Sequence, residues 1–195
     1  MSTPASRCEG IIFPSADANQ RIPFPSSDRS SAIPFPSSNE SERILFPSVQ
    51  WFSALADAMN RNRARQEQLG YVDCVAEFRV LDGGPGGGPV AYQVTFEEFA
   101  AIDVRETDPT SPADAGRADF ALDASLGTWR AMIESIAHGG GRPGLDHTLN
   151  RLSHAGTPIA LRGDDQLRKD TYFRFNQSLQ EFFNASAGFR TAFSG

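Results

Sequence analysis

A five-residue pattern, Ile-x-Phe-Pro-Ser, occurs four times in the first 48 residues, and each copy begins 11 residues after the one before. The copies are residues 11–15, 22–26, 33–37 and 44–48. Proline disfavours a helix at its own position and at the residue before it. The polar spacers show no apolar periodicity that would let the segment bury a core. We therefore expect residues 1–43 to be a disordered tail and residues 44–195 to form one α+β domain.

The repeated pattern has the form of a linear docking motif. In an extended chain, Ile and Phe two residues apart point to the same side and make a two-pronged apolar anchor. Several copies on one tail raise avidity through effective concentration. We expect the tail to dock onto a partner protein or onto neighbouring subunits; the alternative is a duplicated linker without a function. The expected docking residues are Ile11, Phe13, Pro14, Ile22, Phe24, Pro25, Ile33, Phe35, Pro36, Ile44, Phe46 and Pro47.

The fourth copy of the motif runs directly into an apolar helical pattern. Ser48 is a favourable N-cap residue, and Phe52 and Leu55 follow at helical spacing. We expect a helix over about 48–66, with Phe46 packing near its start. If this copy fills a groove on its own domain, the same groove on a neighbouring molecule would suit the upstream copies, as in a swapped element.

Alternation of apolar and polar residues predicts the strands of a sheet. The strands are expected at 72–80, 92–96, 100–104, around Phe120 and Leu122, and at 158–163. In the third of them the alternating apolar residues are Ala100, Ile102 and Val104. Short turns between strands imply an antiparallel meander. The glycine-rich turn 82–89 has neither the spacing nor the Lys-Ser/Thr ending of a phosphate loop.

Helical periodicity returns after the fourth strand. Residues 126–136 carry a clear apolar face, and Leu145, Leu149 and Leu152 predict a short second helix. A long final helix is expected over about 165–187, with the Asp164-Asp165 pair at its start. The order of elements predicts an α+β domain with helices over one face of the sheet.

Charge and cysteine content exclude several classes of protein. The net charge of -6 argues against a general nucleic-acid binder and against a binder of anionic membranes. No segment has the roughly 20 apolar residues needed to span a bilayer, and the first residues lack the apolar run of a signal peptide. Two cysteines are too few for a disulfide framework, so Cys74 is expected to be a buried thiol. These features favour a cytoplasmic protein.

Several local patterns resemble the sterol carrier protein-2 family. They are the Phe-Pro-Ser-x-x-Trp-Phe sequence at 46–52, residues 118–122, Trp129, and residues 159–164 before the long last helix. The resemblance covers roughly residues 44–190. It implies a five-stranded, mostly antiparallel sheet covered by helices, around an apolar tunnel for a sterol, a fatty acyl chain or a similar molecule. It implies no catalytic constellation and no cofactor. The connection 138–157 and the repeat tail depart from the family pattern.

The resemblance also implies which residues would contact a ligand. They are Trp129, Met132, Ile133 and Ile136 in the middle helix, and Phe175, Leu179, Phe182 and Phe183 in the last. On the residue pattern alone, an aromatic stripe at helical spacing is more often a core face than a pocket wall.

The chain offers few candidates for catalysis. His138, His147 and His154 lie close together in sequence, but their spacings of nine and seven fit no compact metal site on one helix. No serine lies in a Gly-x-Ser-x-Gly turn. We therefore expect a non-enzymatic protein, without a metal, for which two functions remain. One is an apolar-ligand carrier with a docking tail. The other is an assembly protein whose domain no longer binds a ligand, which an interior filled by its own aromatic side chains would favour.

Overall fold

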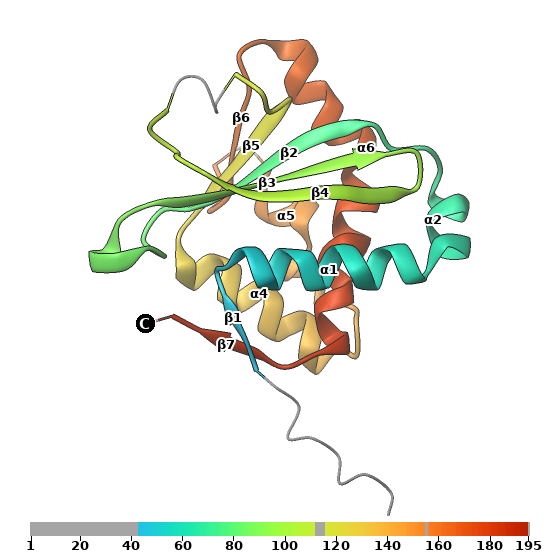
Figure 1. The fold of residues 1–195 in the computed structure, drawn as a ribbon, viewed down its shortest axis with the longest axis horizontal. Coiled ribbons are helices and arrows are strands. Elements are labelled where there is room, and N and C mark those ends of the chain that lie inside the picture. The colour runs from blue at the N-terminus through green and yellow to red at the C-terminus, as the bar shows by residue number, and fades with distance from the viewer. Residues whose placement is uncertain (1–42, 112–115, 155, 195) are drawn as a thin grey trace, which may run out of the picture. The chain divides into compact units, whose positions relative to one another are not determined.

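The computed structural model describes residues 43–111, 116–154 and 156–194. Within these ranges the chain forms a five-stranded, mostly antiparallel sheet with helices packed over one face (Figure 1), which confirms the predicted α+β class. Apart from Arg43, the predicted tail lies outside the described residues. Its disorder and the domain boundary therefore stay predictions.

The sheet combines a meander with one parallel strand. Its members are β2 (Cys74–Val80), β3 (Val90–Glu97), β4 (Ala100–Thr107), β5 (Phe120–Ala124) and β6 (Ala160–Arg162), and their spatial order is β4-β3-β2-β5-β6. β2, β3 and β4 form the predicted antiparallel meander. The meander does not continue into β5, because β5 pairs with the other edge of β2 and runs parallel to it. A parallel pair needs a crossover, and the chain between β2 and β5 supplies it.

The helices are α1 (Val49–Arg61), α2 (Arg63–Leu69), α4 (Leu126–His138), α5 (Leu149–Leu152) and α6 (Gln166–Asn184). Each of the long ones begins at a side-chain cap, which satisfies a backbone N–H group that has no partner within the helix. Ser48 accepts a hydrogen bond from the Trp51 N–H at 3.1 Å, as predicted. Asp165 accepts one from the Arg168 N–H at 2.9 Å.

Three helix boundaries differ from the prediction. The first helix breaks at Asn62, where ψ is 48° and the N–H donates to the Met59 carbonyl, so α2 is a separate helix. The last α-helix ends at Asn184 and continues as a 3₁₀ turn, Ala185–Gly188. Leu145 lies in a 3₁₀ turn outside α5 and is 87% exposed, because α5 begins only after the Thr148 cap.

Ile102 was expected on the buried face of β4, and this was wrong. Thr95 pairs with Asp103 and Phe96 pairs with Ala101, so Ile102 is the extra residue of a β-bulge. The bulge turns Ala101 inward, and Ile102 is left 54% exposed. A one-residue shift reverses the face of each following side chain, which no alternation pattern reveals in advance.

A second, two-stranded sheet was not predicted. β1 (Ile44–Phe46) pairs in parallel with β7 (Thr191–Phe193), and the two strands lie side by side below the helices in Figure 1. The Phe46 side chain is fully buried between these strands and α1. Its ring lies 4.7 Å from that of Trp51 and 6.0 Å from that of Phe193.

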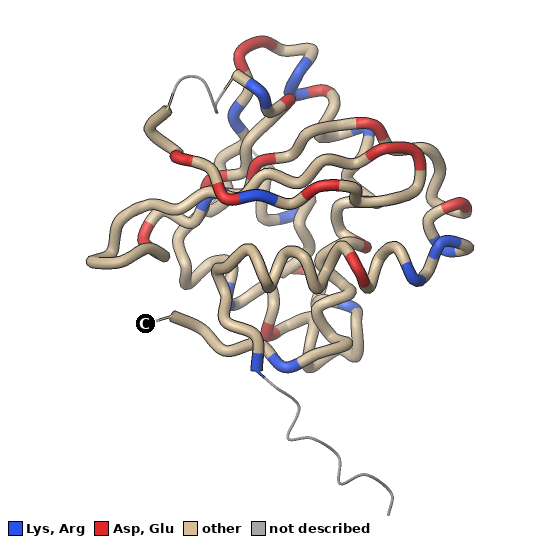
Figure 2. Tube along the Cα trace, in the orientation of Figure 1, with Lys and Arg blue, Asp and Glu red and all other residues tan. Residues whose placement is uncertain are grey.

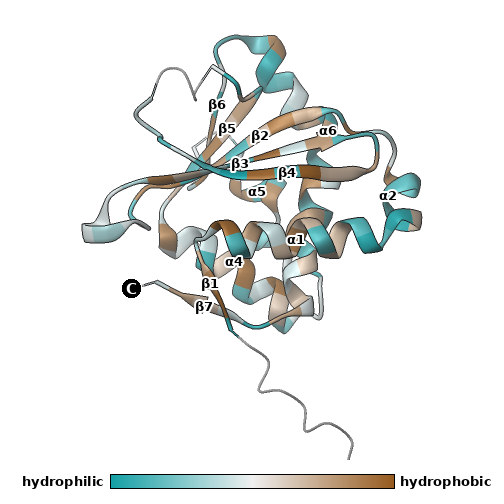
Figure 3. Cartoon of the chain, in the orientation of Figure 1, coloured by the Kyte–Doolittle hydropathy of each residue, from teal (hydrophilic) through white to brown (hydrophobic). Residues whose placement is uncertain are grey.

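The core lies between the five-stranded sheet and the helices. Figure 3 shows hydrophobic residues along the strands and on the helices that face them. Phe78 of β2 is at the centre of this core. Its ring stacks on Phe52 of α1 at 5.5 Å, lies 6.2 Å from Trp129 of α4, and lies 5.1 Å from Phe183 of α6. The helices are therefore held against the sheet mainly by aromatic contacts.

Phe46→Ala is expected to lower the free energy of unfolding by about 3–5 kcal/mol, because it removes a fully buried ring and leaves a cavity. Leu45→Ala is the matched control on the same strand. Leu45 is 48% exposed, so this change should cost within about 0.5 kcal/mol. Urea denaturation of both variants measures the difference, and equal losses would contradict the assigned packing.

Candidate functional site

The eight side chains expected to contact a ligand lie in the interior, on two helices that face the sheet. α4 carries Trp129, Met132, Ile133 and Ile136, and α6 carries Phe175, Leu179, Phe182 and Phe183. None of the eight is more than 6% exposed. The structure brings them into one apolar cluster. Their role in binding a ligand stays a prediction.

Aromatic rings fill much of this interior. The Trp129 and Phe183 rings stack at 5.4 Å with an interplanar angle of 20°. The Phe182 ring meets Phe96 of β3 edge-on at 5.3 Å. Rings at these separations are in contact, so a ligand can lie between them only if side chains move. Of the eight residues, Ile133 and Phe175 also border hollows on the surface.

Polar atoms of the interior are paired within the protein. The Trp129 indole donates to the Arg79 carbonyl at 2.9 Å. The Tyr172 hydroxyl is hydrogen-bonded to Ser153 and accepts from the Asn176 amide at 2.7 Å. Burial raises the pKa of Tyr172 to about 12, and the bonds from Ser153 and Asn176 only partly oppose this shift. An interior with its polar groups already paired suits an apolar ligand and offers no anchor for a charged one.

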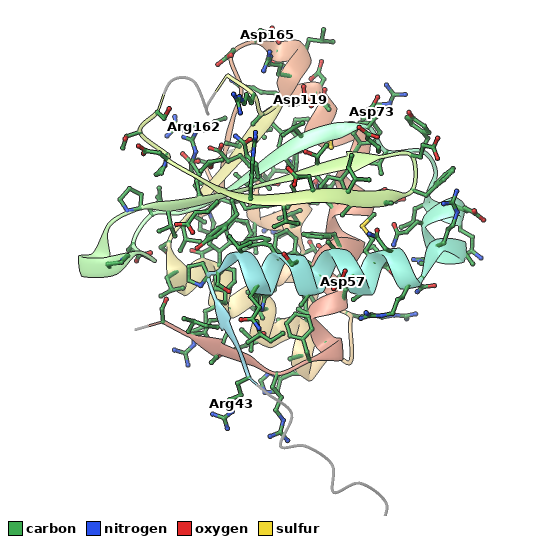
Figure 4. The ribbon with its side chains drawn as sticks, viewed as in Figure 1. Arg43, Asp57, Asp73, Asp119, Arg162 and Asp165 are labelled. Atoms are coloured by element: carbon green, nitrogen blue, oxygen red, sulfur yellow. The ribbon has the colours of Figure 1, made fainter. Side chains whose placement is uncertain are left out.

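A second cluster of polar side chains lies on the face of the sheet away from the helices. Glu77 is 1% exposed and bonds with Arg79, and the Gln93 amide donates to Glu77 at 2.6 Å. Asp123 of β5 accepts from Arg162 at 3.2 Å, while its other carboxylate oxygen has no hydrogen-bond partner among the described residues and lies 3.8 Å from Arg79 Nε. The ion pairs and hydrogen bonds of this cluster link β2, β3, β5 and β6 to one another. Figure 4 shows Arg162 and Asp119 near this end of the sheet.

The cysteine and histidine side chains considered as candidates for catalysis lie in positions typical of structural residues. Cys74 is 3% exposed, and burial, together with the nearby Asp119 and Asp73 carboxylates, raises the pKa of its thiol, so it is a poor nucleophile. His138 ends α4 with Nδ1 2.7 Å from the Glu134 carbonyl oxygen. In residues 43–111, 116–154 and 156–194, no group of three or more His, Cys, Asp or Glu is arranged to hold a metal ion.

Within the same ranges, no helix combines the length and the apolarity that crossing a bilayer requires.

Every repeated position of the fourth motif copy makes a contact with the domain. The Ile44 N–H donates to the Arg190 carbonyl at 2.9 Å, and the Phe46 carbonyl accepts from the Ser194 N–H at 3.0 Å. Pro47 packs so closely on Gly83 that a Cβ at that glycine would lie 2.9 Å from the proline ring. Ser48 caps α1. We call the part of the domain that makes these contacts the motif-binding surface.

The variable position of the motif is the exposed one. Leu45 is 48% exposed. In a parallel pair of strands, every second residue forms the backbone hydrogen bonds to the neighbouring strand. In β1 the residues that bond to β7 are Ile44 and Phe46. A proline in place of Leu45 therefore removes no bond to β7. The residues at this position in the upstream copies are Ile12, Pro23 and Pro34.

The remaining expected docking residues lie outside the described residues. They are Ile11, Phe13, Pro14, Ile22, Phe24, Pro25, Ile33, Phe35 and Pro36. β7 was not predicted from the sequence. Its three residues, Thr191–Phe193, are too few to show an alternation of apolar and polar side chains.

Two solved structures share this fold. One is a conserved hypothetical protein of Thermus thermophilus, named as a candidate sterol carrier protein, with a TM-score of 0.54 and 19% identity over 78% of this chain and 94% of that one. The other is sterol carrier protein 2, with a TM-score of 0.51 and 19% identity over 72% of this chain and 95% of that one. No protein-family model matches the sequence, and no curated protein matches it significantly. The chain therefore has a sterol carrier protein 2-like fold, which confirms the fold that the resemblance implied.

The stability of the domain should fall at alkaline pH. The pKa of Tyr172 in the folded chain, about 12, exceeds that of an unfolded tyrosine, about 10. The contribution of this group is therefore complete below pH 10 and is lost as the pH rises through 12. Urea denaturation at pH values between 8 and 11.5 should show the free energy of unfolding declining. Tyr172→Phe should make this decline with pH shallower. An unchanged slope in that variant would contradict the assignment.

Proposed function

We propose that the protein is a non-catalytic, cytoplasmic binding protein for an apolar, lipid-like ligand such as a sterol or a fatty acyl chain. The observation that carries the proposal is the interior between the sheet and the helices α4 and α6. This interior is apolar and aromatic. In the described part of the chain, the two buried side-chain atoms without a hydrogen-bond partner belong to Asp123 and Ser186, and both lie outside the interior. The same fold is found in sterol carrier protein 2, which supports a lipid-like ligand by analogy.

A ligand of this kind would enter by displacing aromatic side chains. Phe182 and Phe183 lie side by side on the last part of α6, and Phe183 stacks on Trp129 of α4. A small separation of α4 from α6 would break that stack and open apolar space lined by the eight residues. Because the interior presents no polar anchor, its selectivity would rest on shape and apolar area.

The dense packing favours a second candidate function. If the rings do not move, the domain binds no ligand and serves as a platform for an assembly that the tail organises. The Trp129–Phe183 stack and the Phe182–Phe96 contact are the observations in its favour.

We propose under either function that the tail repeats dock onto a partner protein or onto neighbouring subunits. The fourth copy shows which positions of the motif make contacts, and these are the positions that the upstream copies repeat. The upstream copies would bind to the motif-binding surface, or to a similar groove, by pairing with a strand and burying the phenylalanine.

Native mass spectrometry of the full-length protein purified from its own host tests the first function. A monomer with an added mass of a few hundred daltons, removed by organic extraction, is the expected result. Phe183→Trp enlarges a side chain at the stack with Trp129 and should lower the occupancy at least tenfold, whereas Phe173→Trp, on the exposed side of α6, should not. A protein that never carries an adduct, even after incubation with fatty acids and sterols, would favour the second function.

The combined change Phe13→Ala, Phe24→Ala and Phe35→Ala tests the docking proposal. Association of the full-length protein, followed by light scattering over a concentration series or by a co-purifying partner, should be lost, while the melting temperature stays within about 1 °C, as expected for residues of the predicted tail. The matched control changes Ile12, Pro23 and Pro34 to Ala, at the position that is exposed in the fourth copy, and should associate like the parent. Association that survives the phenylalanine changes would refute docking through the motif.

A further inference from the structure

A hollow of about 720 Å³ lies between β7 and α4, outside the interior described above. Its apolar lining includes Ile133 and Ala137 of α4 and Ala192 and Phe193 of β7. A volume of this size is within the range of small-molecule sites. Ile133, which belongs to the proposed ligand-binding residues, is 2% exposed and forms part of both surfaces.

Arginines surround this hollow. Arg43 precedes β1 and Arg190 precedes β7, so the parallel register places them side by side, and Figure 2 shows two adjacent basic segments where the strands begin. Both are exposed, and neither has an ion-pair partner among the described residues. Figure 4 shows the Arg43 side chain at this end of the domain. Two neighbouring guanidinium groups repel each other, and a bound anion would relieve this repulsion.

The third arginine joins the charged and apolar parts. Arg130 of α4 pairs with Glu134 at 2.8 Å, and its guanidinium lies over the Phe193 ring at 5.1 Å from the centroid. Among the described residues, Glu134 is the one acidic residue that lines the hollow, against three arginines. The described lining is therefore positive, in contrast to the net charge of -6 of the whole chain.

A buried hydroxyl supplies the independent sign of a ligand. Ser186 lines the hollow and is 2% exposed, yet its Oγ has no hydrogen-bond partner among residues 43–111, 116–154 and 156–194. An unpaired buried hydroxyl is unfavourable, and a ligand oxygen in the hollow would satisfy it. The Thr191 hydroxyl oxygen, by contrast, accepts from the Trp51 indole at 3.0 Å.

We infer that this hollow binds a single amphiphile with an anionic head, a carboxylate or a phosphate, and a short apolar chain. Arg43 and Arg190 hold the head, Ser186 donates to one of its oxygens, and the chain lies on Ile133, Ala137 and Phe193. The inference goes beyond the proposed function, because it adds a site for an anionic lipid-like ligand outside the interior. A neutral sterol or alcohol would leave the arginines unpaired and bind more weakly.

The two indole N–H groups of the chain distinguish the hollow from the interior. Trp51 donates to Thr191 of β7, beside the hollow, whereas Trp129 donates to Arg79 in the interior. Dodecanoate, kept below its micelle concentration at pH 7.5, should shift the Trp51 indole resonance saturably in ¹H–¹⁵N spectra of the full-length protein and leave that of Trp129 unmoved. Dodecanol, the neutral probe of equal chain length, should bind at least tenfold more weakly.

The double variant R43Q/R190Q should weaken dodecanoate binding at least tenfold, and S186A should weaken it several-fold while leaving the apo protein at least as stable. The control R61Q/R117Q removes two exposed arginines elsewhere and should bind like the parent.

Equal binding of dodecanol, or undiminished binding by R43Q/R190Q, would overturn the inference. A shift of the Trp129 indole alone would overturn it too, while upholding a ligand in the interior; a shift at neither indole would count against both. Co-sedimentation of the protein with phosphatidylglycerol vesicles, lost in R43Q/R190Q but without any dodecanoate shift, would assign the arginines to a membrane surface and refute the single-molecule site.

Discussion

The contact of three helices with one phenylalanine ring holds this domain together. Phe78, at the centre of the sheet, touches rings from α1, α4 and α6, so the position of each helix depends on the same side chain. Close packing of rings is rigid on average, because any gap forfeits contacts on all sides. The interior that would hold a ligand is thus also the main source of stability. Binding there must exchange protein–protein contacts for protein–ligand contacts of similar strength.

Much of the fold was predictable because local signals agreed with it. Ser48 was recognised as a cap, the Asp164-Asp165 pair was expected at the start of the last helix, and the apolar faces of α1, α4 and α6 follow helical spacing. Two of the errors in the sheet occur where a non-local choice decides the structure. The bulge at Ile102 depends on how β4 pairs with β3, and the parallel position of β5 depends on which edge of β2 is open. The residues of the strand concerned do not by themselves determine either choice.

The interior and the hollow beside β7 also differ in how far the sequence predicts them. The interior set lies on two helices whose periodicity and family resemblance were visible in the sequence, and the structure does bring those residues together. The hollow beside β7 was not predicted, because Arg43 and Arg190 are 147 positions apart and become neighbours only through the β1–β7 pairing. An unpaired hydroxyl such as that of Ser186 can be recognised only when all its neighbours are known.

The β1–β7 pairing joins residue 44 to residue 191 and so couples the earliest element of the domain to a late one. During synthesis on the ribosome, the Phe-Pro-Ser segment emerges long before the strand that pairs with it. Until then, Phe46 lacks its contact with Phe193, and the Ile44 and Phe46 backbone groups lack their partners. Contacts of such large sequence separation form late and slow the folding of small domains. The nascent chain therefore carries four copies of one motif, and the fourth lacks its partner strand until almost the whole domain has been made.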